Sequence, residues 1–162
     1  MESQPTHPMH TWLKQLVGEW DVTSNCAFPN STIETTQAHE SAQMLGEYFI
    51  IAHLKGHVPG CEDPIETRFT IGYDEEKDVF PACWCCSMMP RMFTYEGVLS
   101  EDKTTLTLEC EAPDMVDMSI NRMYRDVITI VSATERTFHT MIQQDDGSWE
   151  KFMWSSYTKV NA

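Results

Sequence analysis

Short runs of alternating apolar and polar residues, separated by polar turns, repeat along this chain from Glu19 almost to its C-terminal end. In the clearest run, residues 105–110, apolar side chains occupy the even positions and polar side chains the odd ones. A period of two indicates a strand with one covered and one solvated face. About ten such strands are expected, and their regular spacing without long helices favours a barrel or sandwich over a parallel α/β sheet.

Turn residues bound these strands. Residues 145–147 (Asp-Asp-Gly) are the strongest hairpin signal, because Asp-Gly favours the tight turns that join antiparallel strands. Residues 29–31 (Pro-Asn-Ser) are expected to interrupt the first strand. The later strands are expected at residues 33–44, 48–54, 67–73, 79–87, 92–99, 105–110, 122–132, 137–144 and 149–160. An all-β, antiparallel up-and-down barrel is predicted, since closure leaves no exposed sheet edge.

A short helix is expected just before the first strand. Apolar residues recur at helical spacing over residues 9–17, and Gly18 is expected to end the helix. This helix would plug one end of the barrel, with Trp20 closing the bottom. Residues 1–8 hold two prolines and little apolar mass, which predicts a flexible N-terminal tail. Residues 9–162 are then expected to form a single β-barrel domain.

The charge of the chain limits its partners. It carries 11 Lys and Arg against 25 Asp and Glu, a formal net charge of −14. Such an acidic protein repels phosphates and anionic lipids, so neither nucleic acid nor a membrane is expected as a partner. We find no signal peptide, and no apolar segment approaches the roughly 20 residues that span a bilayer, which predicts a cytoplasmic protein. Its six cysteines are then expected to stay reduced.

Several motifs stand out together along the chain. They are the helix-to-strand segment at residues 12–20, the hairpin start at residues 70–74 (Thr-Ile-Gly-Tyr-Asp), Trp84, residues 95–99 (Tyr-Glu-Gly-Val-Leu), and the ending with Trp154, Tyr157, Thr158 and Lys159. As a set, over about residues 12–159, they resemble the family catalogued as domain of unknown function 1579. The resemblance implies a calycin-like barrel. It implies no reaction, because that family carries no established function.

The segment Gly18-Glu19-Trp20 is also similar to the Gly-x-Trp signature of lipocalins and related barrels. This resemblance implies that Trp20 stacks under a basic side chain from the last strand. Lys159 stands in the matching place, where Arg is the usual residue. A cation over an exposed indole contributes about 0.5–1 kcal/mol, and more when it is desolvated. Trp20 and Lys159 are therefore expected to close the barrel.

The barrel interior is the main candidate site. A barrel of about eight or more strands can hold one small ligand. The chain contains 11 methionines, whose adaptable side chains suit an apolar pocket. Arg91 and Arg122 are candidate partners for a ligand carboxylate, because arginine pairs with it in a bidentate way. The expected ligand-binding residues of the interior are Trp84, Phe93, Tyr95, Arg91, His139, Met141 and Trp154.

The cysteine cluster at residues 83–86 favours a structural interpretation. On a strand, Cys83 and Cys85 point one way and Cys86 the other. A zinc site usually needs a second pair of ligands, and Cys61 and Cys110 stand alone. No metal site is therefore predicted, and these cysteines are expected to be small buried residues.

Two histidines offer an alternative site. His139 lies in the middle of an expected strand and could point into the barrel, while His53 lies near a strand end. Some barrels related to the fatty-acid-binding fold carry haem on a strand histidine, so haem is the alternative to the expected absence of a cofactor. A partly buried histidine with a hydrogen-bond partner is the more ordinary interpretation.

These observations predict a non-enzymatic binding protein for a small apolar or amphipathic ligand held inside the barrel. Two alternatives stay open. One is a structural or dimerisation module without a ligand, working as a homodimer. The other is a haem-binding, metal-binding or catalytic barrel that uses His139 or His53. An enzyme is the less expected outcome, because the chain has no Gly-x-Ser-x-Gly elbow and no Gly-rich phosphate loop.

Overall fold

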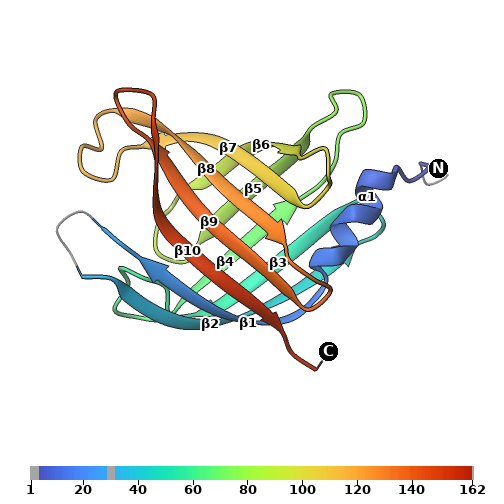
Figure 1. The fold of residues 1–162 in the computed structure, drawn as a ribbon, viewed down its shortest axis with the longest axis horizontal. Coiled ribbons are helices and arrows are strands. Elements are labelled where there is room, and N and C mark those ends of the chain that lie inside the picture. Colours follow the sequence, from blue (N-terminus) through green and yellow to red (C-terminus); the bar gives the residue numbers. More distant parts are fainter. Residues whose placement is uncertain (1–3, 29–31, 162) are drawn as a thin grey trace.

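The computed structural model describes residues 4–28 and 32–161. Within them, ten antiparallel strands close into a barrel in which each strand pairs with the next along the chain and the first pairs with the last (Figure 1). The strands are β1 (Gly18–Cys26), β2 (Glu34–Leu45), β3 (Phe49–Gly56), β4 (Ile65–Ile71), β5 (Phe80–Cys86), β6 (Met92–Leu99), β7 (Thr105–Pro113), β8 (Asn121–Ile130), β9 (Glu135–Gln143) and β10 (Trp149–Lys159). The predicted all-β, up-and-down barrel is confirmed.

The strand boundaries follow the sequence pattern closely. β6 spans the predicted residues, and the weakly apolar run at residues 33–44 forms β2, the longest strand. The interruption expected at residues 29–31 lies outside the described residues, as do residues 1–3 of the expected tail.

The N-terminal helical segment differs from the uniform helix predicted over residues 9–17. α1 (Pro8–Leu13) is α-helical, and a single 3₁₀ turn follows at Lys14–Leu16. Pro8, expected in the tail, is the first residue of α1, where a proline fits because no intrahelical hydrogen bond needs its missing N–H. His7 caps the helix, since its imidazole accepts a hydrogen bond of 3.2 Å from the Met9 backbone N–H.

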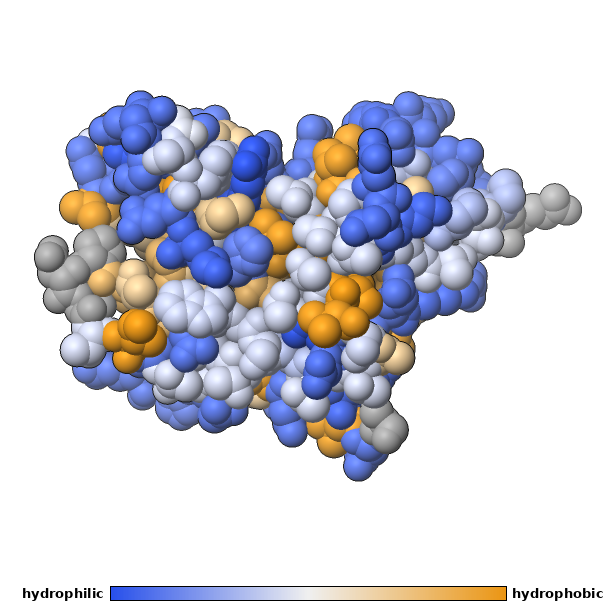
Figure 2. Space-filling model, in the orientation of Figure 1, coloured by the Kyte–Doolittle hydropathy of each residue, from blue (hydrophilic) through white to orange (hydrophobic). Residues whose placement is uncertain are grey.

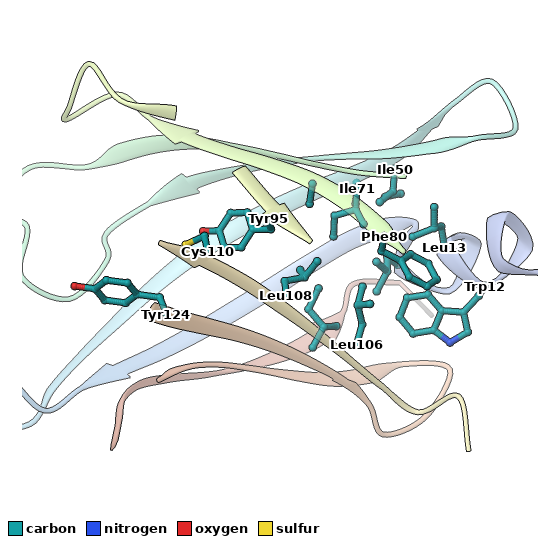
Figure 3. Close-up of a cluster of buried hydrophobic side chains, with 14 of the residues drawn as sticks. Trp12, Leu13, Ile50, Ile71, Phe80, Tyr95, Leu106, Leu108, Cys110 and Tyr124 are labelled. Atoms are coloured by element: carbon teal, nitrogen blue, oxygen red, sulfur yellow. The ribbon is translucent and has the colours of Figure 1, made fainter. Parts of the chain in front are cut away.

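α1 lies across one end of the barrel, which we call the closed end (Figure 1). Trp12 is buried, and its indole N–H donates a hydrogen bond of 2.8 Å to the Lys103 carbonyl in the β6–β7 connection. Leu13, Leu106 and Leu108 are completely buried and belong to one core cluster, which Figure 3 shows beside α1. The helix therefore covers this end of the barrel and completes its core.

The connections after β3, β5, β7 and β9, and the described ends of the connection after β1, lie at the opposite end, which we call the open end (Figure 1, left). On the face shown in Figure 2, hydrophilic residues cover much of the surface and hydrophobic residues form separate patches, several of them near this end. None of the helical segments in the described residues has the length and apolar character needed to cross a membrane.

Candidate functional site

A cavity of about 600 Å³ lies at the open end of the barrel. Small-molecule sites in proteins measure about 300–1,000 Å³, so this volume suits a small ligand. Aromatic and methionine side chains form most of the wall. The lining residues are Phe28, Trp84, Met89, Pro90, Arg91, Phe93, Tyr95, Cys110, Ala112, Pro113, Asp114, Met115, Met118, Tyr124, Asp126, Phe138, Thr140, Phe152 and Met153.

Strand alternation places these side chains in the cavity. On β8, Tyr124 and Asp126 line it, because residues two apart share one face of a strand. β10 departs from this rule. Its pairing with β9 shifts register between Lys151 and Met153, so the successive residues Phe152 and Met153 both line the cavity. The bulge widens the apolar wall by one aromatic ring.

Exposed apolar side chains gather around the mouth of the cavity. Clusters of large exposed apolar side chains are unusual on protein surfaces, and they mark interaction or ligand sites. Of those in the described residues, eight lie in or beside the open-end connections, and we call them the apolar rim: Ile33, Met88, Met89, Met92, Met115, Val116, Met118 and Ile120. The rim continues the apolar lining outward to the surface.

Two arginines lie near the mouth and differ in their partners. Arg122 donates hydrogen bonds to Asp114 and, at 2.8 Å, to Asp145. The backbone N–H groups of Asp117 and Val116, with Arg122, hold the pKa of Asp114 below its usual value. The guanidinium of Arg122 is therefore already paired with two carboxylates of the protein. Arg91 lines the cavity, is exposed, and forms no ion pair with any described residue, so it is the arginine that remains available to a ligand.

Asp126 places a buried carboxyl group in the wall of the cavity, where the residue is 7% exposed. The Thr140 hydroxyl donates a hydrogen bond of 2.7 Å to its Oδ1 atom. Burial raises the pKa of Asp126 to about 6, although hydrogen bonds from Thr140 and Tyr95 oppose the shift. Asp126 is thus mostly ionised at neutral pH, although it lies in an apolar cavity.

Tyr95 and Cys110 lie beside Asp126, and together with Thr140 they form a small polar cluster in the cavity wall. Figure 3 shows the Tyr95 hydroxyl next to the Cys110 sulphur. Burial raises the pKa of Cys110 to about 11 and also raises the pKa of Tyr95. Both groups are therefore neutral at neutral pH, and Asp126 is the charged member of the cluster.

A smaller cavity of about 100 Å³ adjoins the first, sharing Trp84, Phe138 and Met153 in its wall. Glu40 and Arg136 line it and form a buried ion pair. The Arg136 guanidinium also contacts two rings, with its Cζ atom 4.7 Å from the Trp20 ring centre and 4.3 Å from that of Tyr157. This second polar site is neutralised by its own side chains.

The structure divides the expected ligand-binding residues into two groups. Trp84, Phe93, Tyr95 and Arg91 line the large cavity, and their role in binding stays a prediction. His139, Met141 and Trp154 line neither cavity. Phe138 and Thr140 on β9, and Met153 on β10, face inward, so strand alternation turns those three outward. The expected inward direction was wrong because the sequence alone does not fix the strand register.

The two candidate histidines therefore lie off the cavity. His139 faces outward on β9, and burial against its neighbours lowers its pKa. His53 is flanked by Ala52 and Leu54, which line the smaller cavity, and its Nε2 atom lies 2.9 Å from Glu66 Oε2 on the outer surface. Neither ring reaches the space that a haem or substrate inside the barrel would occupy.

The cysteines show no metal-ligating arrangement. All six have free thiols, and Trp84 lines the cavity while Cys83 and Cys85 alternate to the other face. No group of three or more His, Cys, Asp or Glu side chains in residues 4–28 and 32–161 is arranged to hold a metal ion.

Trp20 lies where the sequence places it, at the start of β1 and opposite Lys159 of β10. The Lys159 ammonium is 5.3 Å from the Trp20 ring centre, and the indole N–H donates a hydrogen bond of 3.0 Å to the Leu16 carbonyl. Arg136, from β9, adds the second cation that sequence reasoning missed.

Sequence reasoning also missed Asp126, Thr140 and Cys110. A signal for Asp126 existed, since it stands between Tyr124 and Ile128 at period two in an otherwise apolar run. Aspartate is almost never fully buried unless it has a partner, so an aspartate at an inward position of a strand is a candidate site residue. Thr140 had no such signal, because its contact with Asp126 depends on the β8–β9 pairing.

Comparisons with known proteins agree on the fold. The family model described as "Protein of unknown function (DUF1579)" matches residues 5–159. No curated protein matches the chain. Among solved structures, the S-type phycobiliprotein lyase CPES from Guillardia theta is similar, with a TM-score of 0.64 and 12% identity over 95% of this chain and 93% of that chain.

Two further solved structures are similar. Rv2717c from M. tuberculosis has a TM-score of 0.65 and 9% identity over 97% of this chain and 100% of that chain. EF1p2_mFAP2b, described as bound to DFHBI, has a TM-score of 0.51 and 15% identity over 94% of this chain and 99% of that chain. At these identities the likeness shows the fold alone, a calycin-like barrel.

Proposed function

We propose a function from the cavity itself, because the chain belongs to the DUF1579 family, whose description assigns none. The protein binds a small apolar or amphipathic molecule inside the open end of its barrel and catalyses no reaction on it. The observation that carries this proposal is the cavity of about 600 Å³ with aromatic and methionine walls.

The unfilled volume supports a binding role because protein interiors are normally packed as densely as organic crystals. The core beside α1 meets that standard, with Leu13, Leu106 and Leu108 completely buried. At the open end, Phe93, Phe152 and the other lining rings face a space that they do not fill. A ligand burying about 200 Å² of apolar surface there would gain roughly 5 kcal/mol before the entropic costs of binding.

The apolar rim supports the same proposal. It gives an apolar ligand a continuous path from the surface into the cavity, past Met89 and Met118, which belong to both the rim and the cavity wall. Methionine side chains are flexible and polarizable, so a mouth of this kind adapts to ligands of different shapes. DFHBI, named as bound to one similar barrel, is an example of a small molecule held by this architecture.

The experiment is a titration with Nile red, a neutral dye whose emission moves to shorter wavelength in apolar surroundings. Saturable uptake of one dye molecule per chain is expected. A matched pair of variants locates the dye. Ala112→Trp places a large ring into the cavity, because Ala112 lines it, whereas Glu111→Trp places the same ring on the outer face of β7.

Ala112→Trp is expected to weaken dye binding about tenfold or more, and Glu111→Trp to leave it unchanged. Circular dichroism checks that both variants keep the barrel. A wild-type protein that takes up no dye would overturn the proposal. So would equal binding by the two tryptophan variants, because the dye would then lie outside the cavity.

A further inference from the structure

Three carboxyl groups are buried in the part of the chain that the structure describes, and they differ in their partners. Glu40 forms an ion pair with Arg136, and Asp114 forms one with Arg122. Asp126 is as deeply buried as the other two, but no Lys, Arg or His side chain in residues 4–28 and 32–161 pairs with it. A buried charge without a counter-ion is unusual, because desolvation disfavours it strongly.

The side chains around Asp126 explain why the protein itself does not supply that counter-ion. Tyr95 approaches from β6, Cys110 from β7 and Thr140 from β9, and all three are uncharged at neutral pH. The smaller cavity contains a cation, Arg136, but Arg136 bonds to Glu40.

The mouth of the cavity supplies no counter-ion either. Arg122 is engaged by Asp114 and Asp145, and Arg91 is exposed and forms no ion pair with Asp126 or any other described residue. Because no described residue pairs with Asp126, the open space of the cavity is the side from which a cation can reach its carboxylate.

The Asp126 carboxylate has acceptor capacity to spare. An ionised carboxylate can accept about four hydrogen bonds, and the donor within hydrogen-bond distance of Asp126 in the described residues is the Thr140 hydroxyl, at 2.7 Å. Because Asp126 lines the cavity, its remaining acceptor sites are open to a molecule bound there. The donor that best satisfies them carries a positive charge, since charge-assisted hydrogen bonds are the strong ones.

We propose that the cavity selects molecules with an apolar body and a protonated amine, and that Asp126 receives the amine while the aromatic and methionine walls enclose the body. The inference rests on the proposed function and names its ligand class. The carboxylate is already desolvated and held by the hydrogen bond from Thr140 before the ligand arrives, so binding does not have to order it. The same charge repels an apolar carboxylate from the deep end of the cavity.

The test uses three naphthalene compounds of similar size that compete with Nile red. They are 2-(1-naphthyl)ethylamine, which is cationic, 2-(1-naphthyl)ethanol, which is neutral, and 1-naphthylacetate, which is anionic. Near pH 8 the amine is expected to bind about 10- to 100-fold more tightly than the alcohol, the range expected for a hydrogen bond to a charged group. The carboxylate compound is expected to bind most weakly.

Asp126→Asn removes the charge and keeps the shape, so the ratio of amine to alcohol affinity is expected to fall to about one. Glu96→Gln is the matched control, because it removes an acid next to Tyr95 that lies on the exposed outer face of β6, and the amine preference should remain. In the wild type, amine affinity should fall as the pH is lowered through about 6, where Asp126 gains a proton, while alcohol affinity stays constant.

The outcomes separate this inference from the proposed function. Nile red uptake without an amine preference, or a preference that survives in Asp126→Asn, overturns the inference and leaves the binding function standing. Absence of Nile red uptake overturns the binding function, and the inference with it.

Discussion

At the closed end of the barrel, the buried carboxylate of Glu40 bonds to Arg136, which also contacts the rings of Trp20 and Tyr157. At the open end, the equally buried carboxylate of Asp126 has hydroxyl partners and faces a large cavity. Both acids project inward from strands of the same barrel. The buried charge at the closed end is paired with a cationic side chain of the protein. The buried charge at the open end has no cationic partner among the described residues.

The packing of the two ends differs in the same way. α1 seals the closed end, where Trp12 packs against Phe80 with their ring centres 5.9 Å apart. The open end has no such plug in the described residues, and its rings surround about 600 Å³ of space. Residues that serve binding or catalysis often lower stability. The comparison therefore assigns stability to the closed end and ligand binding to the open end.

The largest effect is expected from breaking the ion pair at the closed end. Arg136→Met leaves the Glu40 carboxylate buried without a partner, which should destabilise the protein by about 3–5 kcal/mol. Urea unfolding followed by tryptophan fluorescence measures the change. Arg68→Met, which alters an exposed arginine of β4, is the control and should stay within about 0.5 kcal/mol of the wild type.

A double variant sharpens this prediction. Glu40→Met combined with Arg136→Met removes both charges, and should be more stable than Arg136→Met alone because no unpaired charge remains. Equal stability of the single and double variants would show that the loss comes from the missing guanidinium stack on Trp20 and Tyr157.

At the open end, removing the buried charge is expected to stabilise the protein instead of destabilising it. The pKa of Asp126 is raised by burial to about 6, so the folded protein holds this proton at pH values where the unfolded chain has released it. Its contribution to stability is therefore full below about pH 4 and lost as the pH rises through about 6. Asp126→Asn should be more stable than the wild type by about 2–3 kcal/mol at pH 7, and the difference should vanish near pH 4.

Unfolding curves of the wild type and Asp126→Asn at a series of pH values test this difference directly. The exposed Glu96→Gln variant controls for the loss of one negative charge and should show no such pH-dependent difference from the wild type. A destabilised Asp126→Asn protein at pH 7 would mean that the carboxylate is satisfied in the folded state, and the contrast between the two ends would disappear.

The smallest change in stability is expected from removing Lys159, the second cation that contacts Trp20. Lys159→Met removes the ammonium that lies 5.3 Å from the Trp20 ring centre while keeping most of its aliphatic chain. The expected loss is about 0.5–1 kcal/mol, because this side chain is only partly buried and Arg136 still faces the same ring. Thermal unfolding monitored by circular dichroism measures it. A loss as large as that of Arg136→Met would make Lys159, not the buried pair, the main support of Trp20.

The sequence predicted the strands well because their signal is local. Alternation over residues 105–110 and the Asp-Asp-Gly turn at residues 145–147 each specify structure over a few residues, and β7 and the β9–β10 connection formed there. The helix was less well predicted. Residues 14–16 tighten into a 3₁₀ turn before β1, a change that the apolar spacing does not reveal.

The candidate site was predicted in part. Trp84, Phe93 and Tyr95 were expected in the interior and line the cavity. His139 and Trp154 were expected there too but line neither cavity, because the sequence alone does not fix which face of a strand points inward. On β10, a bulge between Lys151 and Met153 changes which residues face inward, and no residue type in the sequence predicts this bulge.

By itself, therefore, the sequence determined what depends on neighbouring residues: the strands, their turns, the plug before β1 and the acidic surface. Only the tertiary structure decided what depends on residues far apart. It brought Asp126, Thr140 and Tyr95 together from three strands, and it gave Glu40 a cation 96 positions away along the chain. The physical reason is that strand register and barrel closure set the inner surface, and both are properties of the whole sheet.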